Sequence, residues 1–261
     1  MHTHKTVSFC LLTCLVLAAS VSASSADEVR TPLHDSDASV VRLATSGGDP
    51  FDDTDNDGGA VSGLQVSDPI QGYNRPVFAF NDKLYYYFLK PTAQGLAFIL
   101  PERARICLKN CFYNLSMPVR AANCLFQLKG PELGVEMWRF IINSTAGAGG
   151  LFDPAGRFFY LPTFPEDTGQ TFGAYGSGPG FYFVIPLLGP SSGRDATGKV
   201  VDIALDPLTY LPIPGLRLVV EPIVKTSLDP DAYDKIKQAS LDPYVAVRDG
   251  YLQYREAAIE R

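Results

Sequence analysis

Prolines and Asp-Pro pairs divide this sequence into short segments, and this limits the folds open to it. From residue 68 onward, Asp-Pro pairs begin at residues 68, 153, 206, 229 and 242, each just before or beside an apolar segment. An Asp side chain can cap the free amides at a helix start, and proline suits the first helical position. Further prolines at positions 91, 101, 118, 131 and 190 are expected to begin other helices. The sequence therefore predicts an all-α fold, a single domain of about eight to ten short helices over residues 67–261.

Two segments do not follow this pattern. Residues 181–188 (FYFVIPLL) have the composition of a buried strand, although Pro186 argues against that assignment. Residues 156–179 have no clear hydrophobic period, so a long loop is predicted there.

The N-terminal part of the chain predicts export. Residues 1–23 form a signal peptide, in which Lys5 precedes an apolar run and Val21-Ser22-Ala23 is a small-residue cleavage site. Residues 24–66 have a composition that buries too little apolar surface to fold, so a disordered acidic linker is predicted. The motif DTDNDG at residues 53–58 matches half of a calcium loop, but Leu64 stands where the bidentate Glu is needed. A solvated charge run is therefore favoured over a calcium site.

Charge and residue usage exclude several functions. Acidic and basic residues balance over residues 68–261 without a basic stripe, so no nucleic acid is expected as a partner. His2, His4 and His34 are the only histidines, and all precede residue 67. This excludes Ser-His-Asp and Cys-His catalysis and histidine metal sites, so no catalytic residue and no metal are expected. The adjacent acids Glu166 and Asp167 are interpreted as solvated turn residues.

Cysteines remain at three positions beyond the signal peptide: Cys107, Cys111 and Cys124. Three buried thiols are favoured over one disulfide with a free thiol, and both alternatives stay open. No CxxC motif occurs, which gives a redox motif or a zinc site no support.

The segment over residues 131–144 (PELGVEMWRFIINS) predicts a helix with one narrow polar row. This row is formed at spacings of four, three and four by Glu132, Glu136, Arg139 and Asn143. The helix could be the centre of a soluble core whose polar row reaches the surface. Alternatively, it could touch lipid outside and line a wet cavity with its polar row. The aromatic-rich segment at residues 77–89 (VFAFNDKLYYYFL) supports the second interpretation.

The glycine-rich stretch that follows, residues 143–156 (NSTAGAGGLFDPAG), invites a phosphate-binding interpretation. A P-loop needs a preceding strand and a Gly-Lys-Ser/Thr sequence, but Gly150 follows a helical segment and precedes Leu151 and Phe152. The stretch is therefore interpreted as a flexible exit from the helix, and whether it moves is left open.

Six stretches of the sequence closely resemble the MlaA/VacJ family of phospholipid-transport proteins, in the same order. They are DPIQGYNRPVFAFNDKLYYYFLKP (68–91), NLSMPVRAANCLFQ (114–127), FIINSTAGAGGLFDPAG (140–156), EDTGQTFGAYGSGPGFYFVIPLLGPSSGRDA (166–196), LDPLTY (205–210) and DPYVAVRDGYLQYRE (242–256). The resemblance covers roughly three quarters of the chain.

This resemblance implies a ring-like helical protein in the periplasmic leaflet of a Gram-negative outer membrane, with an amphipathic channel through it. Its partners would be phospholipids, an outer-membrane porin and a periplasmic lipid-carrier protein, and no cofactor is needed. Such a protein would remove mislocalised phospholipids from the outer leaflet and maintain lipid asymmetry. The polar row over residues 132–143 would then line the headgroup path. Three residues of a glycine-rich hinge loop would flank the channel: Gly176, Gly178 and Gly180.

The signal peptide departs from the family, whose members are typically lipidated on a cysteine that ends the signal. Cys14 comes too early and follows Thr13 rather than a small residue, which favours cleavage after Ala23 and leaves the lipid anchor open. A soluble periplasmic lipid-binding protein without an anchor is therefore the alternative function. A lipid hydrolase is disfavoured by the missing histidines.

Overall fold

The computed structural model describes residues 68–212 and 215–261 of this 261-residue chain. The predicted signal peptide and acidic linker, with the calcium-like motif and His34, lie outside these residues. The domain boundaries at residues 23 and 66 therefore stay predictions.

Helices make up most of the described residues. In chain order the first are α3 (Gln71–Leu84), the π-helix η2 (Tyr85–Leu89), α4 (Lys90–Ile99), α5 (Glu102–Leu115), α6 (Met117–Phe126) and α7 (Gly130–Thr145). The others are α8 (Pro154–Phe159), α9 (Thr168–Ala174), α10 (Gly193–Leu205), the 3-10 helix η3 (Pro207–Tyr210), α11 (Leu216–Leu228), α12 (Ala232–Gln238) and α13 (Pro243–Ile259). The predicted all-α, single-domain fold of short helices is confirmed.

Asp side chains cap several helices, as their position before proline predicts. Asp153 accepts a hydrogen bond from the Gly156 amide at the start of α8, and Asp242 accepts one from the Tyr244 amide at the start of α13. Asp206 caps η3 in the same way. The Asp-Pro pairs at residues 68 and 229 lie instead in turns, and their helices begin slightly later, at Gln71 and Ala232. The helices predicted to begin at these two pairs therefore begin three residues after each Asp.

One short hairpin interrupts the helices. Strand β1 (Tyr182–Ile185) pairs antiparallel with β2 (Gly189–Ser192), and Val184 lies opposite Pro190. Pro190 therefore lies in a strand and does not begin a helix, contrary to our prediction. Proline fits there because each strand of a two-stranded hairpin has a free edge that needs no amide donor.

The prediction of a long loop over residues 156–179 is also wrong. These residues contain part of α8 and the whole of α9, which are only six and seven residues long. Helices this short span at most two turns, so their sequence cannot display a hydrophobic period. The side chain of Asp167 caps α9 by accepting a hydrogen bond from the Gln170 amide.

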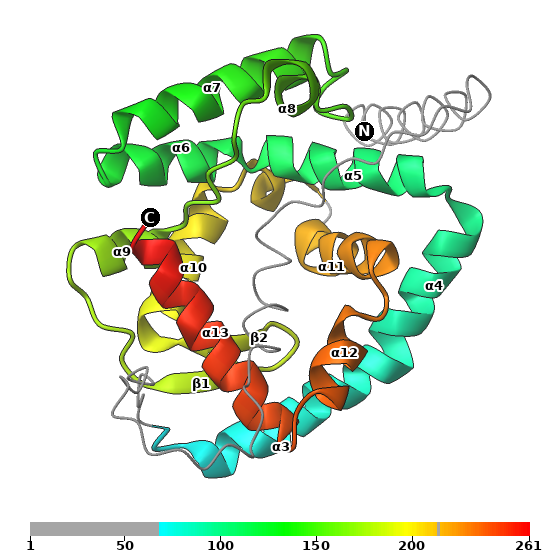
Figure 1. The fold of residues 1–261 in the computed structure, drawn as a ribbon, viewed down its shortest axis with the longest axis vertical. Helices are drawn as coiled ribbons and strands as arrows, with labels where there is room; N and C mark the ends of the chain where they lie inside the picture. The colour runs from blue at the N-terminus through cyan, green and yellow to red at the C-terminus, as the bar shows by residue number, and fades with distance from the viewer. Residues whose placement is uncertain (1–67, 213–214) are drawn as a thin grey trace, which may run out of the picture.

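The elements are arranged as a ring (Figure 1). Helices α3, α4, α5 and α6 follow one another along the ring, and α9, α10, α13 and the hairpin complete it on the other side. Helix α11 packs against α4 and α5, α10 packs against α9, and α7 packs on α6. None of the described helices combines the length and apolar character needed to cross a membrane.

The main apolar cluster is small and joins distant parts of the chain. Tyr182 and Val184 of the hairpin are buried against Tyr244 and Leu252 of α13, and Val77 and Phe78 of α3 cover them. Asn74 of α3 fixes the hairpin from the other side, because its amide donates to the Tyr182 carbonyl and accepts from the Val184 amide. The two ends of the described domain are thus locked together at the hairpin.

Candidate functional site

Large apolar side chains are exposed along much of the described chain. Phe98 of α4 is 92% exposed, and Leu128 and Tyr160, in the connections after α6 and α8, are each 85% exposed. Other large apolar side chains that are at least half exposed include Tyr73, Phe80, Tyr87, Phe88, Ile99, Leu125, Phe126, Trp138, Phe158, Phe159, Leu187, Val200, Tyr210 and Leu218. Exposed apolar surface on this scale marks a surface that contacts lipid or another protein.

The interior shows the opposite composition. Among the buried residues of the described chain, polar and charged side chains outnumber apolar ones. They include Asn74, Asn123, Glu136 and Arg139, residue types that are seldom buried in soluble domains unless they are paired. The protein therefore exposes many large apolar side chains and buries many polar ones, which suits contact of part of its surface with an apolar medium.

Glu136 of α7 is the centre of one buried polar cluster. One carboxylate oxygen accepts hydrogen bonds from the Tyr113 hydroxyl at 2.9 Å and the Phe164 amide at 2.8 Å. The other accepts from Arg120, whose guanidinium nitrogens lie 2.8 and 2.9 Å away. Burial and the Glu136 charge raise the pKa of the Tyr113 hydroxyl above its usual value. This cluster ties α5, α6 and α7 to the segment after α8.

Arg139 forms a second cluster one turn further along α7. Its guanidinium donates to both carboxylate oxygens of Asp153, at 2.8 and 2.9 Å, and to the Leu161 carbonyl. Asn143 also donates to Asp153, at 2.9 Å, and accepts from the Ala155 amide. Burial alone would raise the pKa of Asp153, but Arg139 and these hydrogen bonds hold it below its usual value.

The polar row predicted on α7 therefore has a definite place in the structure. Glu136, Arg139 and Asn143 share one buried face, while Met137, Trp138 and Ile141 are exposed on the other side of the helix. Glu132 is only half-buried. The three buried side chains face protein partners rather than an open lumen, so a role in lining a headgroup path stays a prediction.

Sequence reasoning missed a third buried cluster, centred on Arg255 of α13. Its guanidinium bonds both oxygens of Asp167 at 2.6 and 2.9 Å and both oxygens of Asp195 at 2.9 and 3.0 Å. The Tyr251 hydroxyl adds a bond of 2.6 Å to Asp195. Asp195 and Asp167 lie 60 and 88 residues from Arg255 along the chain, so no local spacing could have indicated this cluster.

The titration of these acids follows from their partners. Burial tends to raise the pKa of both Asp167 and Asp195, but Arg255 outweighs it, so both values are lowered. Glu166, next to Asp167, is buried and bonded to Lys129 at 2.8 Å and to Gln127 at 2.8 Å. The prediction that Glu166 and Asp167 are solvated turn residues is therefore wrong.

Helix α12 is held against α3 and η2 by tyrosines and ion pairs. Lys237 lies 2.8 Å from Asp82, and Tyr233 also donates to Asp82, at 3.0 Å. Asp234 accepts from the Tyr86 hydroxyl at 2.5 Å and forms an ion pair with Lys90. The π-helix thus supplies tyrosines that fasten a short helix to the ring.

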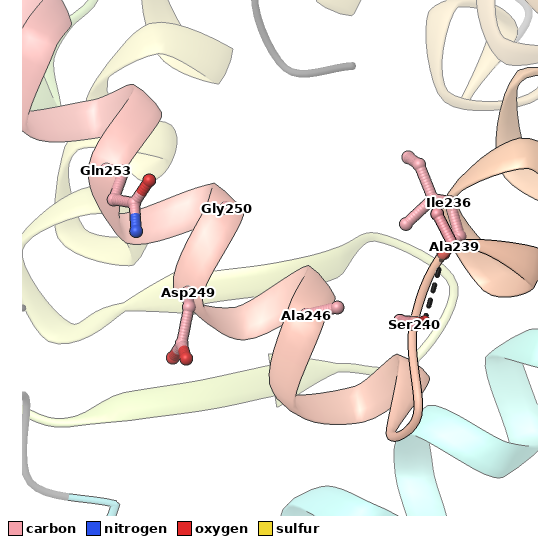
Figure 2. A pocket seen from close by; sticks show the side chains of 7 residues that line it. All are labelled: Ile236, Ala239, Ser240, Ala246, Asp249, Gly250 and Gln253. Atoms are coloured by element: carbon pink, nitrogen blue, oxygen red, sulfur yellow. Dashed lines mark hydrogen bonds between the residues drawn. The ribbon is translucent and has the colours of Figure 1, made fainter. Parts of the chain in front are cut away.

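A pocket of about 160 Å³ lies between α12 and α13. Figure 2 shows its two sides, with Ala246, Asp249 and Gln253 on α13 and with Ile236, Ala239 and Ser240 opposite them. Its lining comprises Ile236, Ala239, Ser240, Ala246, Asp249, Gly250 and Gln253. A Cβ atom added at Gly250 would meet nothing within 4 Å, so this wall of the pocket is open.

The two glycine-rich loops differ in their packing. A Cβ atom at Gly147 would lie 2.4 Å from the Asn143 carbonyl oxygen, and one at Gly150 would lie 2.5 Å from the Asn114 side chain. This exit from α7 is therefore closely packed rather than loose. In the other loop, Gly176 and Gly180 have left-handed φ angles of 83° and 70°, and Gly178 does not. Their role as a hinge stays a prediction.

No disulfide joins Cys107, Cys111 and Cys124, the cysteines of the described residues. Cys124 is buried, and burial together with the nearby Glu166 charge raises its pKa to about 11. Cys107 and Cys111 are only half-buried, so the expectation of three buried thiols holds fully for one of them. Within the part of the chain that the structure describes, no group of three or more His, Cys, Asp or Glu side chains could hold a metal ion.

Comparison with known proteins gives one consistent result. A family model described as "MlaA lipoprotein" matches residues 66–258. An uncharacterized protein of Rickettsia felis is 37% identical over 204 residues, which cover 76% of this chain and 80% of the relative. The "Intermembrane phospholipid transport system lipoprotein MlaA" of Escherichia coli K12 is 33% identical over 192 residues, covering 72% of this chain and 76% of the relative.

The fold agrees with the sequence. A structure solved in work on the "Structural basis for maintenance of bacterial outer membrane lipid asymmetry" superposes with a TM-score of 0.66 at 30% identity. The match covers 74% of this chain and 99% of the other.

Proposed function

This chain belongs to the MlaA lipoprotein family, and from that premise we propose that it transports phospholipids between the membranes of a bacterial envelope. In this proposal it removes phospholipids that have reached the outer leaflet of the outer membrane, and so maintains lipid asymmetry. It lies on the periplasmic side of that membrane, contacts a porin and passes lipid through an amphipathic channel to a periplasmic carrier. Non-enzymatic transfer of this kind needs no catalytic residue and no cofactor.

The observation that carries the proposal is the reversed distribution of polarity. Exposed side chains such as Phe98 and Trp138 favour contact with acyl chains, because burying apolar surface in lipid is favourable. The buried charges, such as Glu136 and Arg255, are satisfied by protein partners and do not require water. A protein built this way can remain in a lipid leaflet without a spanning helix.

The direct test measures outer-leaflet phospholipid in cells that lack this gene. Accumulation that is reversed by the full-length gene is expected. Unchanged levels, together with a purified protein that does not associate with membranes, would contradict the proposal. Recovery of the protein in the soluble periplasm with bound lipid would instead favour the alternative, a soluble lipid-binding protein.

The row formed by Glu132, Glu136, Arg139 and Asn143 enters the proposal as a headgroup path under one condition. The segment over residues 161–164 contacts two members of the row, because the Phe164 amide bonds Glu136 and the Leu161 carbonyl bonds Arg139. This segment would have to move away before the row could face a lipid. A covalent crosslink between the segment and α7 should then stop transport. Full transport by the crosslinked protein would show that the row does not line the headgroup path.

We also propose the loop with Gly176, Gly178 and Gly180 as a hinge. All three glycines are exposed, and an added Cβ atom would meet no close neighbour. Alanine at Gly178, whose φ is not left-handed, would therefore restrict the backbone without a steric clash. Slower transport by Gly178→Ala, with an unchanged melting temperature, is expected. A change in stability without a change in transport would indicate a fixed loop.

A further inference from the structure

We propose that the turn between β1 and β2, residues 186–188 (PLL), contacts the acyl chains of a phospholipid that passes the ring. This inference rests on the proposed function and extends it, because it assigns the contact with the lipid tails to one element. The turn takes part in none of the three buried polar clusters.

Leu187 has a backbone conformation that its side chain disfavours. Its φ angle is 69°, in the left-handed region where a Cβ atom crowds the backbone and glycine is normally found. Two residues later, at a φ angle of 84°, the chain does use a glycine, Gly189. Bulky residues with positive φ angles are uncommon and cluster at functional sites. A leucine at this position therefore indicates a use for the side chain itself.

Two asparagines of α3 hold the hairpin in place. Asn81 donates to the Ile185 carbonyl at 3.0 Å and accepts from the Leu187 amide at 2.9 Å, so it spans the start of the turn. Asn74 lies two helical turns earlier on the same face of α3 and makes the same pair of bonds further back along β1. These four bonds fix the turn against α3 and maintain the strained conformation of Leu187.

The turn is apolar and uncovered. Leu187 is 72% exposed, Leu188 is 45% exposed, and Pro186 is exposed as well. In the view of Figure 1 the turn lies within the ring of helices, between α12 and α13, and not on the outer side of the ring. Exposed apolar side chains are unfavourable in water and favourable against an apolar ligand.

The hairpin offers no charge to a lipid headgroup. Residues 169–193, which include both strands and the turn, contain no Asp, Glu, Lys or Arg. A phosphate or an ammonium group needs an opposite charge or several hydrogen bonds when it leaves water. A hydrocarbon chain needs apolar contact only, so the tails of the lipid are the part that this turn suits.

The test places a tryptophan next to Leu187. Trp138 is the only tryptophan of the chain, so Leu188→Trp in a Trp138→Phe background reports on the turn alone. The full-length protein in detergent micelles is titrated with a phospholipid brominated on its acyl chains, which quenches tryptophan fluorescence on contact. Saturable quenching is expected. Unbrominated phospholipid should reverse it, whereas glycerophosphoethanolamine, a headgroup without acyl chains, should not.

Substitutions of Leu187 in this background measure what the side chain contributes. Leu187→Ser should weaken the lipid affinity about tenfold, the effect of losing the burial of one leucine side chain. Leu187→Gly should weaken it as much and yet raise the melting temperature, because glycine relieves the left-handed φ angle. Leu241→Ser is the matched control, since Leu241 is also exposed but lies in the connection between α12 and α13. It should leave the affinity unchanged.

Three results would overturn the inference. An unchanged affinity in Leu187→Gly, at a raised melting temperature, would show that the leucine has no use in binding. Equal losses in Leu187→Ser and Leu241→Ser would show that the effect is not specific to the turn. Lost transport in cells that carry Leu187→Ser, without quenching in the titration, would assign the turn to a protein partner. None of these results contradicts the transport function, which fails only if cells that lack the gene keep unchanged outer-leaflet phospholipid levels.

Discussion

Glu136 shows why a polar interior constrains single residues so strongly. Its side chain is fully buried, and four donor groups from Tyr113, Arg120 and Phe164 surround its carboxylate. Removing one partner of a buried ion pair leaves the other charge without compensation. Replacing Glu136 therefore leaves the buried Arg120 guanidinium without its charged partner, and this loss determines how far the substitution lowers stability.

We expect Glu136→Ala to lower the free energy of unfolding by about 3–5 kcal/mol. Glu132→Ala is the matched control on the same helix, because Glu132 is half-buried and makes no ion pair within the described residues. It should change stability by less than about 0.5 kcal/mol. Denaturant unfolding in detergent micelles measures both, and equal losses for the two variants would contradict the assignment.

The lowered pKa values of Asp167 and Asp195 predict that the stability of the protein depends on pH. Their folded-state pKa values lie below the ordinary 3.8, because Arg255 outweighs the effect of burial. A lowered folded pKa contributes stability that is fully present above the unfolded value and is lost as pH falls through the folded value. The free energy of unfolding should therefore decline from about pH 4 downward.

Unfolding measured between pH 6 and pH 2 tests this expectation. Asp195→Asn should be less stable than the parent at pH 6 and should lose less stability on acidification. The exposed Asp229 provides the control, since Asp229→Asn should follow the parent curve. A parent whose stability stays constant below pH 4 would show that Arg255 does not hold these carboxylates ionised.

At this scale, local spacing predicted which α7 side chains share a face, because helical periodicity fixes that from the sequence. It did not predict their partners. Arg120 and Asp153 lie on other elements, and the pairing of Arg255 with Asp195 spans 60 residues. The acidic pair Glu166 and Asp167 was misjudged for the same reason.

At the scale of elements, α7 contains two glycine positions with opposite expected effects. Gly134 lies inside the helix with nothing within 4 Å of an added Cβ atom, so Gly134→Ala should stabilise by about 0.5–1 kcal/mol. Gly147 follows the helix, where a Cβ atom would lie 2.4 and 2.6 Å from the backbone oxygens of Asn143 and Phe152. Gly147→Ala should destabilise by about 1–3 kcal/mol.

Thermal unfolding of the two alanine variants checks this difference in sign. It also decides between a packed and a loose exit from α7, since a loose loop would tolerate Gly147→Ala. The sequence excluded a phosphate cradle here because strand and lysine were missing. It could not show the close packing, which depends on Phe152 and Asn114 folding back onto the loop.

Prolines predicted the helical segments well where they precede an apolar run, as in α6, α7 and α13. Pro91 does not begin a helix as predicted, because α3, η2 and α4 continue without a break from Gln71 to Ile99. Prolines also failed where tertiary contacts decide. Pro190 lies in a hairpin that Asn74 and Tyr244 hold in place, and α8 and α9 are too short to carry a period. Element type was therefore predictable for the longer helices but not for segments whose form depends on their neighbours.

For the whole molecule, the reversed distribution of polarity predicts how the protein meets a membrane. Met137, Trp138 and Ile141 lie on the exposed face of α7, opposite its buried polar row. If this face lies in a lipid leaflet, Trp138→Ser removes a large apolar contact, and burial of such a side chain contributes about 1.5–3 kcal/mol. Partitioning of residues 24–261 into phospholipid vesicles should then fall by about tenfold or more.

Glu132→Ala serves as the control, because it changes the same helix away from the exposed apolar face and should leave partitioning unchanged. Vesicle co-sedimentation measures both variants against the parent. Apolar contact should also make the binding insensitive to salt, since electrostatic attraction to lipid would weaken as salt screens it. Partitioning that is lost at high salt but unaffected by Trp138→Ser would place this face of α7 outside the leaflet and would leave the soluble lipid-binding alternative as the better account.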